Sequence, residues 1–139
     1  MNGPRENPSS APERTAPLIY IVDDETLLSE MAAMVLGALG YSVKTFANAE
    51  TALAAFAQAR PHPCLMITDY AMPEMTGMKL IAECRRVDPE LKTVLVSGTQ
   101  KEQVYGNLPC KPDRFLAKPY RARDLIEAVV ALTGRAGDP

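Results

Sequence analysis

The sequence lacks tryptophan, holds a single histidine and has only three cysteines among its 139 residues. Cys64, Cys84 and Cys110 are odd in number and stand at no spacing typical of metal ligands, so they predict neither a disulfide framework nor a zinc site. We expect them to be reduced thiols that pack inside a cytoplasmic protein. His62 stands alone between two prolines and is expected to be a surface loop residue rather than a ligand.

Long apolar runs and a strong charge of either sign are also missing. No stretch reaches the roughly 18 apolar residues that a membrane-spanning helix needs, and the amino terminus lacks the apolar core of a signal peptide. The net charge is −2, which argues against a nucleic-acid-binding surface. We therefore expect a cytoplasmic globular protein, a monomer or weak dimer, with neither nucleic acid nor membrane as a partner.

What the sequence does contain is one alternating pattern of short apolar runs and amphipathic segments. Residues 1–16 hold three prolines and no apolar periodicity, which predicts a disordered tail. Residues 17–134 are expected to form one domain, and residues 135–139 a short C-terminal tail. The length and the lack of internal repeats fit a single hydrophobic core.

The apolar runs and their periods predict the individual elements. Strands are expected at 18–22, 41–46, 64–68, 93–96 and 114–117. Helices are expected at about 25–39, 48–60, 76–87 and 121–133, with a short and weak one between 100 and 107. The first helix places Leu27, Leu28, Met31, Val35 and Leu39 along one apolar stripe. Alternating strands and helices indicate the α/β class. The specific prediction is a flavodoxin-like, doubly wound (βα)5 three-layer sandwich with parallel strand order 2-1-3-4-5.

Four of the five predicted strands end in polar side chains of complementary chemistry. Asp23 and Asp24 follow the first strand, and Asp69 follows the third. Ser97 follows the fourth and Lys118 follows the fifth. The carboxyl ends of parallel strands share one edge of the sheet, so these groups are expected to converge. Three carboxylates repel one another unless a cation neutralises them, and a hard dication such as Mg²⁺ or Mn²⁺ fits oxygen ligands.

Each of these residues also has an ordinary explanation when it is taken alone. An aspartate is common at helix caps and turns, a serine is common in turns, and a strand-end lysine can reach out to solvent. Their order, each closing a different strand, favours a joint phosphoryl and metal site instead. A cis peptide bond between Lys118 and Pro119 is plausible here.

The motifs around these groups resemble the receiver domains of two-component response regulators. They are residues 22–25, residues 68–73 with Gly77, residues 96–98 and residues 115–119. The resemblance covers about residues 17–134. It implies that Asp69 accepts a phosphoryl group from a sensor histidine kinase or a phosphotransfer protein. It also implies that Asp24, Asp69 and the backbone carbonyl of Ala71 bind Mg²⁺, with Asp23 acting mainly through a bound water.

The same resemblance implies a switch. Lys118 would pair with the phosphoryl group, and Ser97 would hydrogen-bond a phosphoryl oxygen and move toward it. Phe115 stands at the position of the family's switch aromatic and would turn into the space that Ser97 leaves, although a plain core aromatic is the alternative there. The segment from residue 105 to residue 112, with its two prolines, makes the face that binds an unknown output protein unusual. No DNA-binding element follows residue 134, so a direct transcription factor is not expected.

Two other functions compete with the switch. A Mg²⁺-dependent phosphohydrolase working through an aspartyl-phosphate, of the haloacid dehalogenase type, would carry a second acid where this chain has Ala71. A receiver-like docking module that acts unphosphorylated would not need Asp69. We therefore expect no enzyme activity beyond self-phosphorylation and self-dephosphorylation.

Overall fold

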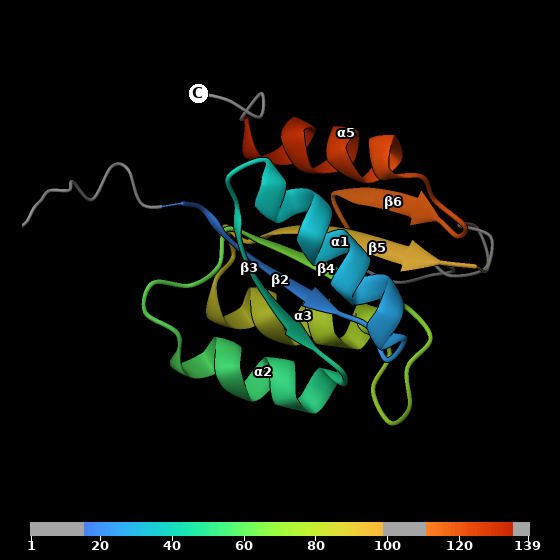
Figure 1. Cartoon of the computed structure of the whole chain (residues 1–139). Coiled ribbons are helices and arrows are strands. Elements are labelled where there is room, and N and C mark those ends of the chain that lie inside the picture. The colour runs from blue at the N-terminus through green and yellow to red at the C-terminus, as the bar shows by residue number, and fades with distance from the viewer. Residues whose placement is uncertain (1–15, 99–110, 135–139) are drawn as a thin grey trace, which may run out of the picture.

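A computed structural model describes residues 16–98 and 111–134, and it is built around a five-stranded parallel sheet (Figure 1). The strands are β2 (Leu18–Val22), β3 (Ser42–Phe46), β4 (Leu65–Asp69), β5 (Lys92–Ser97) and β6 (Arg114–Ala117). Their order across the sheet is β3-β2-β4-β5-β6. This is the predicted flavodoxin-like order 2-1-3-4-5, which is thereby confirmed.

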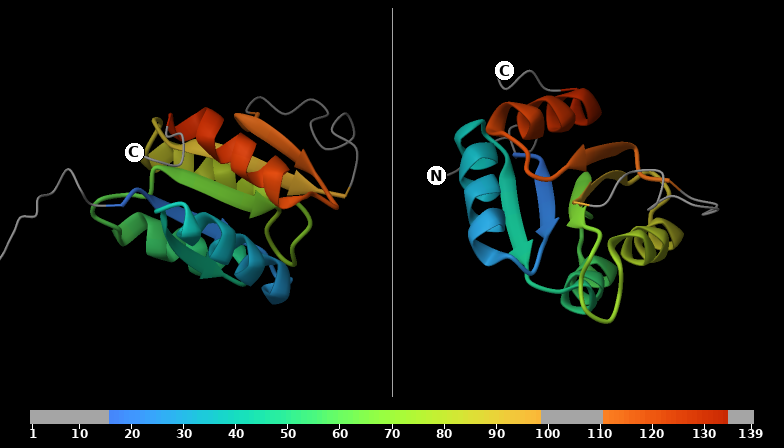
Figure 2. Two further views of the ribbon diagram at one scale, coloured as in Figure 1. Left: turned by 45° about the horizontal axis from the view of Figure 1, so that its top comes forward. Right: turned by 90° about the vertical axis from the view of Figure 1, so that its right-hand side faces the viewer.

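Within the described residues, four helices cover the two faces of the sheet. They are α1 (Thr26–Ala38), α2 (Ala49–Gln58), α3 (Gly77–Val87) and α5 (Ala122–Thr133). Figure 2 shows α1 and α5 together on one face and α2 and α3 on the other. The weak helix expected between residues 100 and 107 and the two tails lie outside the described residues.

The core has two halves because successive strand residues point to opposite faces. Ile19 and Ile21 of β2 pack toward α1 and α5, where Leu36 and Val129 are fully buried. Tyr20 and Val22 point the other way, toward α2 and α3. The central strands of a sheet that is covered on both faces are buried on both sides, which explains why β2, β4 and β5 are largely apolar.

Helix α1 packs through a face that matches the predicted apolar stripe only in part, since Val35 and Leu39 pack against the core. Its buried residues are Ser29, Ala32 and Leu36. Leu27 is 79% exposed and Met31 is 58% exposed, so the expectation for these two residues is wrong. Two small side chains on the buried face leave little bulk between the helix and the sheet. The apolar period was read correctly, but it does not tell which side of the helix is covered.

The helix ends follow the sequence signals. The Asn48 side chain accepts a hydrogen bond from the Thr51 N–H at 2.8 Å, which caps α2. Thr76 caps α3 in the same way, through the Lys79 N–H at 3.2 Å. Gly134 ends α5 in the left-handed conformation with φ of 73°. These caps fix where α2 and α3 begin, and α3 begins directly beside the candidate site.

Candidate functional site

The predicted site residues meet at the edge where the parallel strands end. Asp23 and Asp24 follow β2, and Asp69 is the last residue of β4, one position further into the strand than expected. Ser97 is the last residue of β5, and Lys118 follows β6. The Lys118 N–H donates to the Ser97 carbonyl oxygen at 2.9 Å, so the last two strand ends are joined directly.

Three carboxylates form a tight cluster at this edge. Oxygen atoms of Asp23, Asp24 and Asp69 all lie within 4.8 Å of one another. Asp23 and Asp69 are buried, and Asp24 is exposed. Two buried carboxylates and one facing solvent form a half-open set of hard oxygen ligands, which fits a divalent cation such as Mg²⁺. The loop residue Ala71, whose carbonyl was the fourth expected ligand, lies two positions after Asp69.

Lys118 places its ammonium group among these acids. Its Nζ lies 3.3 Å from Asp69 Oδ1 and 3.6 Å from Asp23 Oδ2. It also donates a hydrogen bond to Glu25 Oε1 at 2.9 Å. The peptide bond from Lys118 to Pro119 is cis, as the sequence made plausible.

The burial of these charges shifts their proton equilibria. Burial, reinforced by the nearby Asp23 charge, raises the pKa of Asp69 to about 6 even though Lys118 acts against it. Burial also raises the pKa of Asp23, against a hydrogen bond from the Glu25 N–H. Burial alone would lower the pKa of the Lys118 ammonium. Its three carboxylate partners outweigh burial, with the hydrogen bond to Glu25 first among them, and the pKa lies above its ordinary value. The site therefore holds more negative charge than one lysine balances.

Gly77 allows the backbone of α3 to lie against the end of β4. A Cβ atom placed on Gly77 would overlap the carbonyl oxygen of Asp69 and would come within 3.0 Å of the Leu95 side chain. The Gly77 N–H donates to the Tyr70 carbonyl at 2.9 Å, and the Tyr70 N–H donates to the Val96 carbonyl at 2.8 Å. These hydrogen bonds fix the backbone on both sides of Asp69. The close approach of α3 to Asp69 explains why the last position of the 68–77 motif is a glycine.

The two expected switch residues lie on neighbouring strands. Ser97 is buried at the end of β5. Phe115 of β6 is half-buried and packs with Tyr70 against a small cluster formed by Met78, Ile81 and Leu95. The structure therefore places an aromatic ring partly at the surface, one strand away from the hydroxyl that was expected to control it.

Sequence reasoning assigned no role to Glu25, although it stands within the 22–25 motif. Its carboxylate lies closer to the Lys118 ammonium than those of Asp69 and Asp23 do. The two residues are 93 positions apart, so only the fold brings them together. The available signal was a third consecutive acid after β2.

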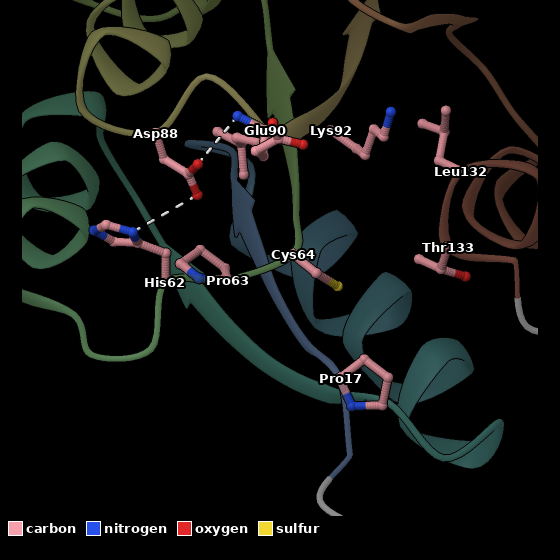
Figure 3. A pocket seen from close by; sticks show the side chains of 10 residues that line it. Pro17, His62, Pro63, Cys64, Asp88, Glu90, Lys92, Leu132 and Thr133 are labelled. Carbon is pink, nitrogen blue, oxygen red and sulfur yellow. Dashed lines mark hydrogen bonds and ion pairs between the residues drawn. The ribbon is translucent and has the colours of Figure 1, made fainter. Parts of the chain in front are cut away.

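A pocket of about 540 Å³ lies at the opposite edge, where the strands begin (Figure 3). Its lining includes His62, Asp88, Lys92 and Cys64. His62 Nδ1 lies 3.6 Å from Asp88 Oδ2, and the His62 ring stacks on Phe56 at 4.6 Å between ring centroids. Cys64 is exposed just before β4, so the expectation of a packed thiol is wrong there and right for the buried Cys84. None of the predicted site residues lines this pocket.

A doubly wound parallel sheet with an aspartate cluster and a lysine at its carboxyl edge is the arrangement that the receiver-like motifs predicted, and comparison with known proteins identifies the same family. The family described as the response regulator receiver domain matches residues 19–130. The chain belongs to the response regulator receiver domain family.

Individual relatives support the same assignment. The response regulator receiver protein CpdR of Brucella abortus is 29% identical over 113 residues, which cover 80% of this chain and 92% of that protein. The probable transcriptional regulatory protein TcrX of Mycobacterium tuberculosis is 28% identical over 86% of this chain and 50% of its own length. A CheY-like receiver domain protein from Methanospirillum hungatei has a TM-score of 0.77 at 27% identity, covering 84% of this chain and 92% of that chain.

The chain spans about half of the length of TcrX, whose full activity is therefore not carried over to it. The relatives are regulators of two-component systems, so the chain is a receiver domain of that kind. Within residues 16–98 and 111–134, no helix has the length and apolar character needed to cross a bilayer.

Proposed function

We propose that this protein is a phosphoacceptor switch that takes a phosphoryl group on Asp69. The observation that carries the proposal is the placement of Asp69: a buried carboxylate at a strand end, 3.3 Å from the Lys118 ammonium and clustered with Asp23 and Asp24. This arrangement supplies a nucleophile and positive charge at one point, which are the main protein contributions to phosphoryl transfer.

The chemistry is a displacement at phosphorus. An ionised Asp69 oxygen forms a new bond to the phosphorus of a phosphohistidine, and the phosphorus–nitrogen bond breaks. The electron pair of that bond stays on the imidazole nitrogen of the donor, and Asp69 becomes an acyl phosphate. A divalent cation held by Asp23, Asp24, Asp69 and the Ala71 carbonyl would neutralise the phosphoryl oxygens. Lys118 would pair with one of those oxygens once it leaves the carboxylates.

The switch would follow from the new charge at Asp69. Ser97 lies at the neighbouring strand end and would donate its hydroxyl to a phosphoryl oxygen. Phe115 is half-buried, and an inward turn would complete its burial. Because phenylalanine has no hydroxyl, this turn would leave no buried polar group without a hydrogen-bond partner. The surface around β6 and α5 would thereby change, and a protein partner would read that change.

The phosphodonor must come within bonding distance of Asp69, so its docking surface must border this edge. An apolar stripe of Leu27, Met31 and Met34 on α1 meets that condition, since α1 begins two residues after Asp24. These three side chains are 79%, 58% and 70% exposed. We infer that the stripe contacts a sensor histidine kinase or phosphotransfer protein. Met31→Glu should then slow transfer from a protein donor and leave phosphorylation by acetyl phosphate unchanged.

The test is direct phosphorylation of the full chain. Wild-type protein incubated with Mg²⁺ and acetyl phosphate should gain one phosphoryl group by intact mass, and Mg²⁺ with beryllofluoride should shift the amide NMR signals of residues near Asp69 and Phe115. Asp69→Asn should abolish both responses. Asp88→Asn, the same change at the opposite edge, should keep both. A wild-type protein with no Mg²⁺-dependent response would overturn the proposal.

A further inference from the structure

Lys118 has three carboxylate partners, and one of them lies outside the aspartate cluster. The Glu25 contact, at 2.9 Å, is shorter than the contacts to Asp69 at 3.3 Å and Asp23 at 3.6 Å. An ammonium group has three N–H donors, and in this arrangement one of them is directed at Glu25. The lysine that would pair with a phosphoryl group is therefore already engaged by an acid that binds no phosphoryl group itself.

Glu25 is placed so that its contact with the Lys118 ammonium can form and break. Its backbone N–H donates to Asp23 Oδ1 at 2.9 Å, which fixes its main chain against the acid cluster. Its side chain is 63% exposed, whereas that of Asp69 is 7% exposed. A hollow of about 380 Å³, lined by Leu28, Pro119 and Tyr120 together with the pair itself, borders the contact. The Glu25 carboxylate can therefore swing into solvent at little cost, which the buried Asp69 carboxylate cannot do.

We propose that Glu25 is a positioning residue that holds the Lys118 ammonium in the unphosphorylated protein and competes with the phosphoryl group for it. This inference rests on the proposed function, because it concerns the lysine of the same site. Two effects act in one direction. The Glu25 carboxylate occupies a donor of Lys118, and its negative charge lies close to the place where phosphoryl oxygens would sit. Both lower the affinity of the site for a phosphoryl group.

One surface acid therefore sets how tightly the unphosphorylated site binds a phosphoryl group. Exchange of the carboxylate for an amide keeps the size and a hydrogen-bond acceptor but removes the competing charge. The affinity for a phosphoryl mimic should then rise about two- to fivefold, the range that an exposed ion pair supports. Mg²⁺ affinity should stay unchanged or fall, because a nearby negative charge has been removed and Lys118 is freer to compete for the aspartates. A general loss of structure would weaken both.

The experiment compares full-length wild type, Glu25→Gln and Glu30→Gln. Glu30 is exposed on α1 and provides the same charge change away from Lys118. Beryllofluoride is titrated at saturating Mg²⁺, and Mg²⁺ is titrated alone, both followed by amide NMR. Lys118 side-chain signals are recorded in each state. Glu25→Gln should bind beryllofluoride more tightly, and its Lys118 signals should differ from wild type before beryllofluoride addition and approach wild type after it.

The possible failures separate the two proposals. Wild type that does not bind beryllofluoride with Mg²⁺ would remove the proposed function and this inference together. Wild type that binds, with Glu25→Gln binding equally or more weakly, would overturn the role of Glu25 and leave Asp69 as the acceptor. An equal gain in Glu30→Gln would also overturn it, since the effect would then come from net charge on α1 and not from the contact with Lys118.

Discussion

The two edges of the sheet both carry acids and a lysine, but the acids are buried at one edge and partly exposed at the other. At the carboxyl edge, Asp23 and Asp69 are buried beside one ammonium, and the pKa of Asp69 rises to about 6. At the amino edge, the 540 Å³ pocket has His62 and Asp88 as a partly exposed pair and an exposed Lys92. Among the described residues, the 540 Å³ hollow therefore lies at the edge whose charges are the more exposed. We therefore expect unbalanced buried charge, more than the size of a pocket, to indicate which edge receives a ligand.

The largest effect expected from this comparison concerns the two lysines. Lys118→Met should slow phosphorylation by acetyl phosphate about a hundredfold, because it removes the only cation of the described residues that contacts Asp69. Lys92→Met, the matched change at the amino edge, should leave the rate within twofold of wild type. Rates are measured by intact mass at saturating Mg²⁺. Equal rates for the two variants would mean that the edges do not differ in chemistry.

The next effect tests how the backbone supports Asp69. Gly77→Ala should lower the free energy of unfolding by about 2–4 kcal/mol, because the new methyl group overlaps the Asp69 carbonyl. Gly37→Ala is the control, since a Cβ there meets nothing within 4 Å and lies inside α1. That variant should gain up to about 1 kcal/mol from helix propensity. Urea unfolding measures both. A Gly77→Ala protein as stable as wild type would show that α3 can move away from the site freely.

A third effect tests the charge imbalance through pH, in EDTA so that no metal contributes. The folded-state pKa of Asp69 is about 6, above its ordinary value of 3.8, so ionised Asp69 destabilises the fold at neutral pH. Asp69→Asn should be more stable than wild type by about 1–2 kcal/mol at pH 8. This difference should shrink as the pH falls through 6 and be gone near pH 4, as wild-type Asp69 takes up its proton.

Asp124 provides a control of opposite sign for the same titration. A hydrogen bond from the Arg121 N–H lowers the pKa of Asp124, so its ionised form stabilises the fold above the ordinary pKa and the benefit is lost as the pH falls through the folded value. Asp124→Asn should therefore be less stable than wild type at neutral pH, with the difference vanishing in acid. If both variants shift stability in the same direction, the raised pKa of Asp69 is wrong.

The difference between the edges was largely predictable from the sequence. Apolar runs that end in Asp23, Asp69, Ser97 and Lys118 predicted the meeting of these groups, because parallel strands leave their carboxyl ends at one edge, and five such strands fitted the doubly wound order. The relevant information lies in short segments, each closing one strand. This is why the pattern could predict which groups meet, while their individual roles came from the resemblance to receiver domains.

What the sequence could not predict depends on contacts between distant segments. The period of α1 was correct, but the sheet covers Ser29, Ala32 and Leu36 and leaves Leu27 and Met31 exposed. Which side of a helix is covered follows from how closely the helix lies on its sheet, and apolarity by itself does not determine that. The contact between Glu25 and Lys118 depends on two loops that only the finished fold brings together.

The smallest effect concerns the amino edge itself. His62→Ala should cost about 0.5–1.5 kcal/mol of stability, because the ring stacks on Phe56 with an interplanar angle of 13° and the ion pair with Asp88 is partly exposed. Beryllofluoride affinity at saturating Mg²⁺ should not change. Urea unfolding and an NMR titration on the same sample give both values. A loss of beryllofluoride affinity without a loss of stability would show that the amino edge is coupled to Asp69 through the sheet, and the contrast between a structural edge and a reactive edge would then fail. We expect a change in stability alone, because the Asp88 carboxylate at the amino edge already has His62 as its partner. Asp69, in contrast, has more negatively charged neighbours than Lys118 can neutralise.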